Sequence, residues 1–134
     1  MANALFDPGR EGVLDDTIEM STADVRVMLV KSTYVFSAAH KFLADLGAVD
    51  NGRSATLGGK TFTSGVFDAN DTTITATAAV ACASLIGFVH TGNDATARVI
   101  WFEDTPASGL PFTPAAAQVV TITWDNGANK IFKL

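Results

Sequence analysis

Asp68, Asn70 and Asp71 come nearest, in type and spacing, to a chemical site in this sequence. Carboxylate and amide oxygens are the ligands that Ca²⁺ prefers, so this cluster could contact the ion. The cluster lacks the regular spacing and the terminal Glu of a calcium-binding loop. An Asx-rich turn between two strands explains the same residues. We favour the turn and expect no metal site, with an ion contact as the alternative.

The other groups that could carry out catalysis are isolated from suitable partners. His40 has no second ligand one helical turn away, and His90 stands at the end of an expected strand. Glu103 and Asp104 are adjacent, and neighbouring residues of a strand point to opposite faces, so they do not form a carboxylate pair. Cys82 has no basic neighbour in sequence, which indicates a small buried thiol. We therefore expect no catalytic residue, no cofactor and no enzyme.

Three aromatic residues allow two readings. Trp101, Phe102 and Trp124 would form a platform on which sugar rings stack if their side chains were exposed. Aromatic residues at alternating positions of strands are more often part of the core. We favour the core, and the platform remains the alternative.

Composition restricts the possible partners. Only 17% of residues are charged while 48% are hydrophobic, which suits a subunit that buries part of its surface against neighbours. The net charge of −5 and the lack of a basic cluster argue against binding nucleic acid or an anionic membrane. The N-terminus does not resemble a signal peptide, and the uncharged stretch at 72–94 predicts strands rather than a membrane span. We expect synthesis and folding in a reducing cytoplasm.

The order of turn signals predicts an all-β fold, mainly an antiparallel β-sandwich or a barrel-like sheet, in one domain over residues 1–134. Gly and Asn punctuate short apolar runs from residue 50 onward. One or two short α-helices are expected in the N-terminal third: apolar spacing predicts a helix at 37–46, and Asp7-Pro8 predicts a turn or two of helix. The strands are expected at 25–30, 53–57, 60–63, 73–77, 85–90, 98–103, 119–124 and 130–134.

The last two of these strands are expected to form a hairpin. Asn126 and Gly127 supply a turn, and an odd-length loop would place Trp124 and Phe132 on one face. We expect Trp124 to be buried beside Phe132 or Leu134, with Gly127 at a positive φ.

The N-terminus is expected to include an arm, residues 1–16, in which Leu5 and Phe6 are the candidate interface residues. These two apolar residues precede the helix signal and could anchor on this domain or on a neighbour. With the low charge, they predict a homo-oligomer, most simply a trimer.

Several strings in the sequence are similar to those of a known group of proteins. They are ALFDPGREG at 4–12, AAHKFL at 38–43, GVFDA at 65–69, GLPFTP at 109–114 and ITWDNGANKIFKL at 122–134. On these strings the chain resembles small virion structural proteins of tailed bacteriophages and prophages, over nearly its full length. The resemblance implies a component of the virion that binds other virion proteins, above all the major capsid protein.

Three functions therefore compete at the level of sequence. The first is a capsid decoration protein that bridges capsid subunits, and the second is a tail, neck or fibre-associated protein. The third is a carbohydrate-binding or adhesin module. We favour decoration, because oligomeric proteins of this kind strengthen an assembled shell by adding contacts from outside.

Overall fold

The longest strands of the chain form an antiparallel five-stranded sheet in the order β1-β7-β6-β2-β3. The computed structural model describes residues 4–104, 112–128 and 130–134. Their elements are β1 (Ala4–Leu5), α1 (Asp7–Leu14), β2 (Val25–Lys31), the 3-10 helix η1 (Leu43–Leu46), β3 (Asp50–Arg53), the 3-10 helix η2 (Thr63–Gly65), β4 (Val66–Phe67), β5 (Thr72–Thr75), β6 (Cys82–Val89), β7 (Val99–Glu103), β8 (Val119–Ile122) and β9 (Phe132–Lys133). The expected mainly antiparallel β fold is confirmed.

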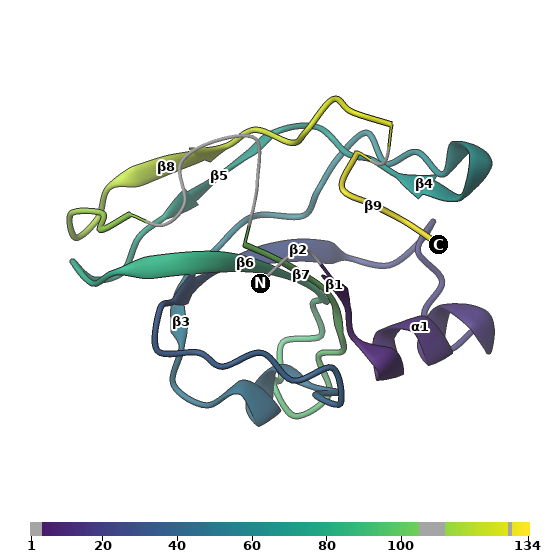
Figure 1. Ribbon diagram of the computed structural model, residues 1–134, viewed down its shortest axis with the longest axis horizontal. Helices are drawn as coiled ribbons and strands as arrows, with labels where there is room; N and C mark the ends of the chain where they lie inside the picture. The colour runs from purple at the N-terminus through teal and green to yellow at the C-terminus, as the bar shows by residue number, and fades with distance from the viewer. Residues whose placement is uncertain (1–3, 105–111, 129) are drawn as a thin grey trace.

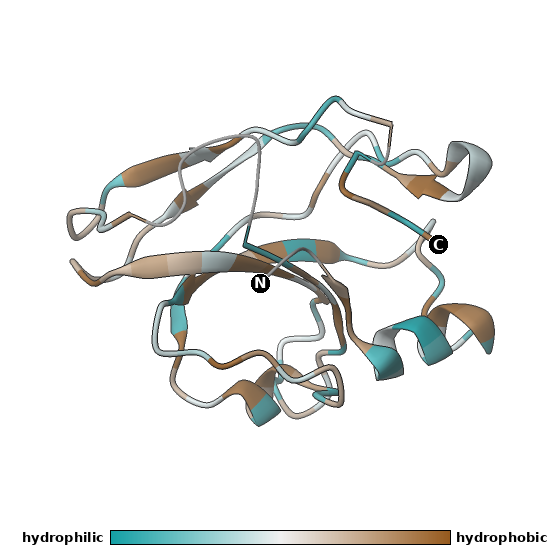
Figure 2. Ribbon diagram, in the orientation of Figure 1, coloured by the Kyte–Doolittle hydropathy of each residue, from teal (hydrophilic) through white to brown (hydrophobic). Residues whose placement is uncertain are grey.

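The centre of this sheet is the pair β2–β6. The two strands stay in register from Val25 opposite Val89 to Val30 opposite Ser84, with one irregularity before Lys31. Both strands are buried on both faces, which explains why their sequences read as nearly continuous apolar runs. Figure 2 shows the hydrophobic colouring along the central strands, whereas the middle of α1 is hydrophilic.

Each face of the central sheet has its own cover. Two ribbons, β5–β8 and β4–β9, lie over one face, as Figure 1 shows. Ile74, Phe67 and Trp124 come from this cover and enter one apolar cluster with Val27 and Trp101 of the sheet. The chain between β2 and β3 lies over the opposite face. It contributes the residues Leu43, Leu46 and Val49 to a second cluster.

The prediction of a helix at 37–46 is wrong. Only Leu43–Leu46 are helical, as a single 3-10 turn. Backbone groups of this segment bond to distant strands instead: Leu43 N–H donates to Ala97 C=O at 2.9 Å, and Val99 N–H donates to Lys41 C=O at 3.0 Å. Long-range pairing therefore overrides the helical spacing, although that spacing correctly marks Leu43 and Leu46 as buried.

The N-terminal segment packs on its own domain. β1 pairs with β7, with Leu5 opposite Trp101, and Phe6 N–H donates to Ile100 C=O at 3.0 Å. Phe6 is 0% exposed and its ring packs on Phe36, with centroids 5.3 Å apart. This corrects the interface assignment of Phe6, because its side chain belongs to this chain's core, and Leu5 is half-buried beside it.

The prediction of a hairpin formed by the last two strands is also wrong. β8 pairs with β5, and β9 pairs with β4, so the two strands belong to different ribbons. Gly127 is not among the glycines with positive φ, and a Cβ there would meet only the carboxylate of Asp125. The burial of Trp124 is confirmed, and Asn126 lies exposed in the connection.

The strand predictions have three outcomes. Those expected at 25–30, 73–77, 85–90, 98–103 and 119–124 correspond to β2, β5, β6, β7 and β8. Those expected at 53–57 and 60–63 are misplaced: β3 ends at Arg53, and the second segment runs into η2. The strand expected at 130–134 is reduced to Phe132–Lys133.

Phe6→Ala is expected to lower the free energy of unfolding by about 3–5 kcal/mol, because it leaves a cavity under β7. Val35→Ala is the control, since Val35 is 81% exposed and its truncation should change stability by less than about 0.5 kcal/mol. Urea unfolding of both variants measures the difference. Equal stability of the two variants would mean that the N-terminal segment is not anchored through Phe6.

Candidate functional site

The acidic cluster serves the fold. Asp71 Oδ1 accepts a hydrogen bond from Trp124 N–H at 3.0 Å, and the Asn70 carbonyl accepts one from the Trp124 indole N–H at 3.0 Å. Asp68 forms an ion pair with Lys130 at 3.8 Å. These contacts fix Trp124 and the segment before β9. Within residues 4–104, 112–128 and 130–134, no group of three or more His, Cys, Asp or Glu side chains is placed to hold a metal ion.

The isolated residues also have structural partners. Tyr34 Oη and His40 Nδ1 are 2.9 Å apart, and the backbone N–H of His90 donates to Asp24 C=O at 2.8 Å. Cys82 is buried as expected, and its burial raises the pKa of the thiol. The Asn51 amide donates a hydrogen bond to Cys82 Sγ at 3.1 Å. This thiol is therefore poorly suited to act as a nucleophile.

The sugar-stacking platform is wrong for the residues proposed. Trp101, Phe102 and Trp124 are all buried. Trp101 and Trp124 meet edge to face with ring centroids 6.2 Å apart. Phe102 packs on Phe36 on the opposite face of the sheet. Their faces are therefore occupied by other core side chains.

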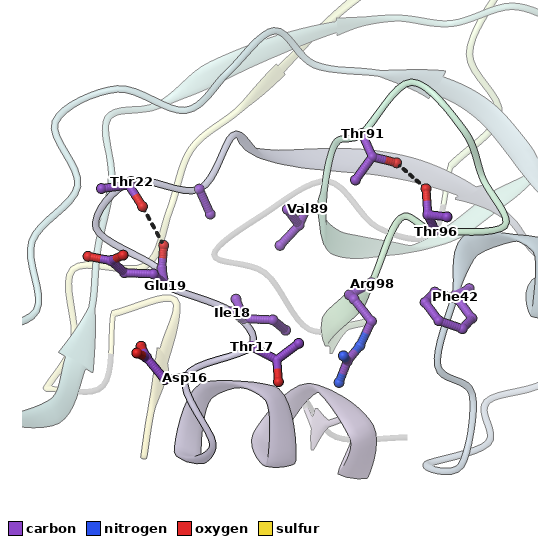
Figure 3. A pocket seen from close by; sticks show the side chains of 11 residues that line it. Asp16, Thr17, Ile18, Glu19, Thr22, Phe42, Val89, Thr91, Thr96 and Arg98 are labelled. Carbon is purple, nitrogen blue, oxygen red and sulfur yellow. Dashed lines mark hydrogen bonds between the residues drawn. The ribbon is translucent and has the colours of Figure 1, made fainter.

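An open cleft of about 570 Å³, with polar and apolar residues in its lining, lies between the segment that follows α1, the end of β6 and the loop after β6 (Figure 3). The Thr91 and Thr96 hydroxyls bond to each other at 2.7 Å, and Arg98 Nη2 donates to the Pro8 carbonyl. Asp16 and Glu19 line the opposite side. The two hydroxyls and Arg98 Nη2 thus have partners within the chain, whereas Arg98 Nε is buried without a hydrogen-bond partner among the described residues. The cleft pairs no nucleophile with a base.

A second hollow, of about 220 Å³, is lined almost entirely by apolar side chains and lies where α1, η2 and the C-terminal strand meet. Two of its residues are large and exposed: Phe62 is 42% and Leu134 is 55% accessible. We call this feature the apolar hollow; its lining also includes Val13, Met20, Val66 and Phe132. Exposed apolar side chains gathered around a concavity are typical of a protein-binding surface.

The floor of the apolar hollow is formed by packed aromatic rings. An aromatic chain runs inward from Phe62 to Phe67 at 5.8 Å, from Phe67 to Phe132 at 5.1 Å and from Phe132 to Trp101 at 5.5 Å, measured between ring centroids. Leu134 is held at the rim because its N–H donates to Gly65 C=O at 3.0 Å. A partner would therefore meet a surface whose backbone is already ordered, which reduces the entropy cost of binding.

Sequence reasoning did not find the apolar hollow. Its residues come from α1, from the turn before β4 and from the chain end, which are far apart in sequence. Two local signals were present: Phe62 and Leu134 are apolar residues next to turn or terminal positions. Neither signal shows that the two side chains share one hollow.

Glu103 is a buried acid that the sequence did not single out as unusual. It is 1% exposed, and its Oε2 accepts no hydrogen bond within the described part of the chain. Burial raises the pKa of Glu103 to about 7, the Trp101 indole on the same face of β7 partly offsets that rise, and the charge of Asp125 adds to it. The carboxyl is therefore protonated in the folded chain below neutral pH.

Stability is expected to fall as the pH rises from 4.5 to about 7, because the folded state holds the Glu103 proton that the unfolded state releases. Over this window the loss amounts to about 3 kcal/mol. Glu103→Gln should remove this dependence of the unfolding free energy on pH. Glu11→Gln, at an exposed position, should keep it. Urea unfolding at several pH values measures the slope, and an unchanged slope in Glu103→Gln would contradict the assignment.

Comparisons with models of protein families, with curated proteins and with solved structures gave no match to this chain. In the part of the chain that the structure describes, no helix has both the length and the apolar character needed to cross a bilayer.

Proposed function

We propose that this chain is a non-enzymatic structural protein of a bacteriophage virion, and that it decorates the capsid by bridging capsid subunits. The observation that carries the proposal is the apolar hollow with its exposed residues Phe62 and Leu134. The resemblance of the sequence to small virion proteins supports the same role. In this proposal the central sheet and the two ribbons are the layers of a β-sandwich that presents the hollow.

The apolar hollow would receive apolar side chains of the major capsid protein. Removing apolar surface from water contributes roughly 25 cal/mol per Å², so a contact centred on Phe62 and Leu134 adds binding energy to each copy. Because this energy exists only when the shell is assembled, many copies stabilise the shell by mass action. The proposed location is the virion, after synthesis in the host cytoplasm, with no cofactor, nucleic acid or membrane required.

The main alternative is a tail, neck or fibre-associated protein, which would use the same hollow against a different virion protein. The carbohydrate-binding module receives less support, because the aromatic residues suggested for stacking are buried. The proposal also includes self-association, which the low charge of the sequence favours.

Phe62→Asp and Leu134→Asp are expected to weaken binding to capsids at least about tenfold, because each places a charge in an apolar contact. Val35→Asp is the control, since it changes an exposed apolar residue outside the hollow. The measurement is co-sedimentation with expanded heads of the encoding phage that lack this protein, followed by cryo-electron microscopy of the pellet. Urea unfolding of each variant shows whether it is folded under the binding conditions, because Phe62 also packs on Phe67.

Two results would contradict the decoration role. Wild-type protein that decorates tails or necks while leaving heads bare would favour the alternative location. Wild-type protein that binds neither heads nor tails would remove the virion function altogether. Equal binding of Phe62→Asp and the wild type to heads would keep decoration but exclude the apolar hollow as its contact.

A further inference from the structure

Among the residues that the structure describes, no strand pairs with the outer edge of β8. β8 belongs to a two-stranded ribbon in which β5 is its only neighbour among the described residues. A strand edge presents a row of backbone donors and acceptors, and these favour pairing with another extended chain.

The pairing of β8 with β5 shows which residues of β8 direct their backbone groups away from β5, where another strand could bind them. Ala76 N–H donates to Gln118 C=O at 2.8 Å, and Trp124 N–H donates to Asp71 at 3.0 Å, so the even-numbered residues of this strand bond toward β5. In an antiparallel ladder the bonding direction alternates along the strand. Val119, Thr121 and the following Thr123 therefore direct their N–H and C=O groups to the outer edge.

Although β8 is short, this edge carries none of the side chains that usually prevent strand pairing. Natural edges are protected by Lys, Pro, bulges or very short strands. Residues 119–123 read Val-Val-Thr-Ile-Thr and contain no charge and no proline. Val119 is exposed, as are the two threonines. In a chain of net charge −5, this uncharged edge is a place where two copies can meet without opposing like charges.

The edge is also complementary to itself. If two copies align antiparallel about Thr121, then Thr121 faces its own equivalent, and Val119 faces Thr123 of the other copy. On the inner side, the half-buried Val120 would lie against Ile122 of the other copy. Thr–Thr and β-branched apolar pairs of this kind are favourable between neighbouring strands. We propose that β8 pairs with β8 of a second copy around a two-fold axis at Thr121, joining the ribbons into one four-stranded sheet.

The proposed β8–β8 contact is weak and has two-fold symmetry. A pairing of about five residues per chain buries less than the roughly 1,200 Å² of a stable interface, so the isolated dimer is weak. A two-fold contact gives a dimer, in place of the trimer that the sequence suggested as the simplest oligomer. The inference depends on the strand edge alone and stands independently of the proposed virion role.

Cysteine cross-linking captures such a weak dimer. Opposed residues of a hydrogen-bonded antiparallel pair have Cα atoms about 5.5 Å apart, which suits a disulfide. Thr121→Cys should therefore form a disulfide-linked dimer with oxidised glutathione. Thr73→Cys is the matched control, because Thr73 is the register partner of Thr121 on β5 and is equally exposed. Its two copies would lie roughly 14 Å apart across the joined sheet. Cys82 is buried and stays unmodified in both variants.

A charge variant tests the same pairing without cross-linking. Thr121→Lys places two like charges opposite each other and should weaken association roughly fivefold in sedimentation equilibrium. Thr73→Lys adds the same charge to each copy, but the two lysines would lie farther apart than the screening length of about 10 Å at 0.1 M salt. This variant should therefore associate like the wild type. Cross-linking of Thr121→Cys at no more than the Thr73→Cys level would overturn the proposal. Equal association of the two lysine variants would overturn it as well.

Discussion

The packing of Trp101 across the central sheet is the contact on which the two ribbons depend. Its ring lies over Gly87 of the neighbouring strand, where an added Cβ would come within 2.0 Å of the indole. From there it reaches Trp124 at 6.2 Å, Phe67 at 5.7 Å and Phe132 at 5.5 Å. One side chain of β7 thus contacts both strands of the β4–β9 ribbon and also Trp124, which follows β8. Neither ribbon has enough strands to be stable alone. Placing the ribbons also places the apolar hollow and the β8 edge.

The sequence predicts the central strands well because their pattern and their environment agree. β2 and β6 are buried on both faces, and their sequences are accordingly nearly continuous apolar runs. The terminal hairpin failed because local turn chemistry at Asn126-Gly127 is compatible with a hairpin but does not require one. Pairing of β8 with β5 and of β9 with β4 is decided by contacts between residues 44 to 67 positions apart in the sequence, which periodicity does not report. The helix at 37–46 failed for the same reason.

The candidate site was harder to predict than the fold. Residues that looked chemical, such as Asp71 and Asn70, serve to hold Trp124 in place. The surface that we connect with function consists of ordinary apolar residues, Val13, Phe62 and Leu134 among them, whose proximity is created only by folding. Glu103 is similar: its sequence position marks it as the end of a strand, and its raised pKa follows from burial, which only folding creates.

The role of Trp101 can be tested most directly by native-state hydrogen exchange of Trp101→Leu. If the indole is what holds the ribbons on the sheet, amides of β4, β5, β8 and β9 should exchange much faster than in the wild type, while the β2–β6 pair keeps most of its protection. Ribbon protection equal to that of the wild type would contradict this account. A loss spread evenly over ribbons and central sheet would contradict it too, because the ribbons would then not depend on Trp101 more than the rest of the fold does.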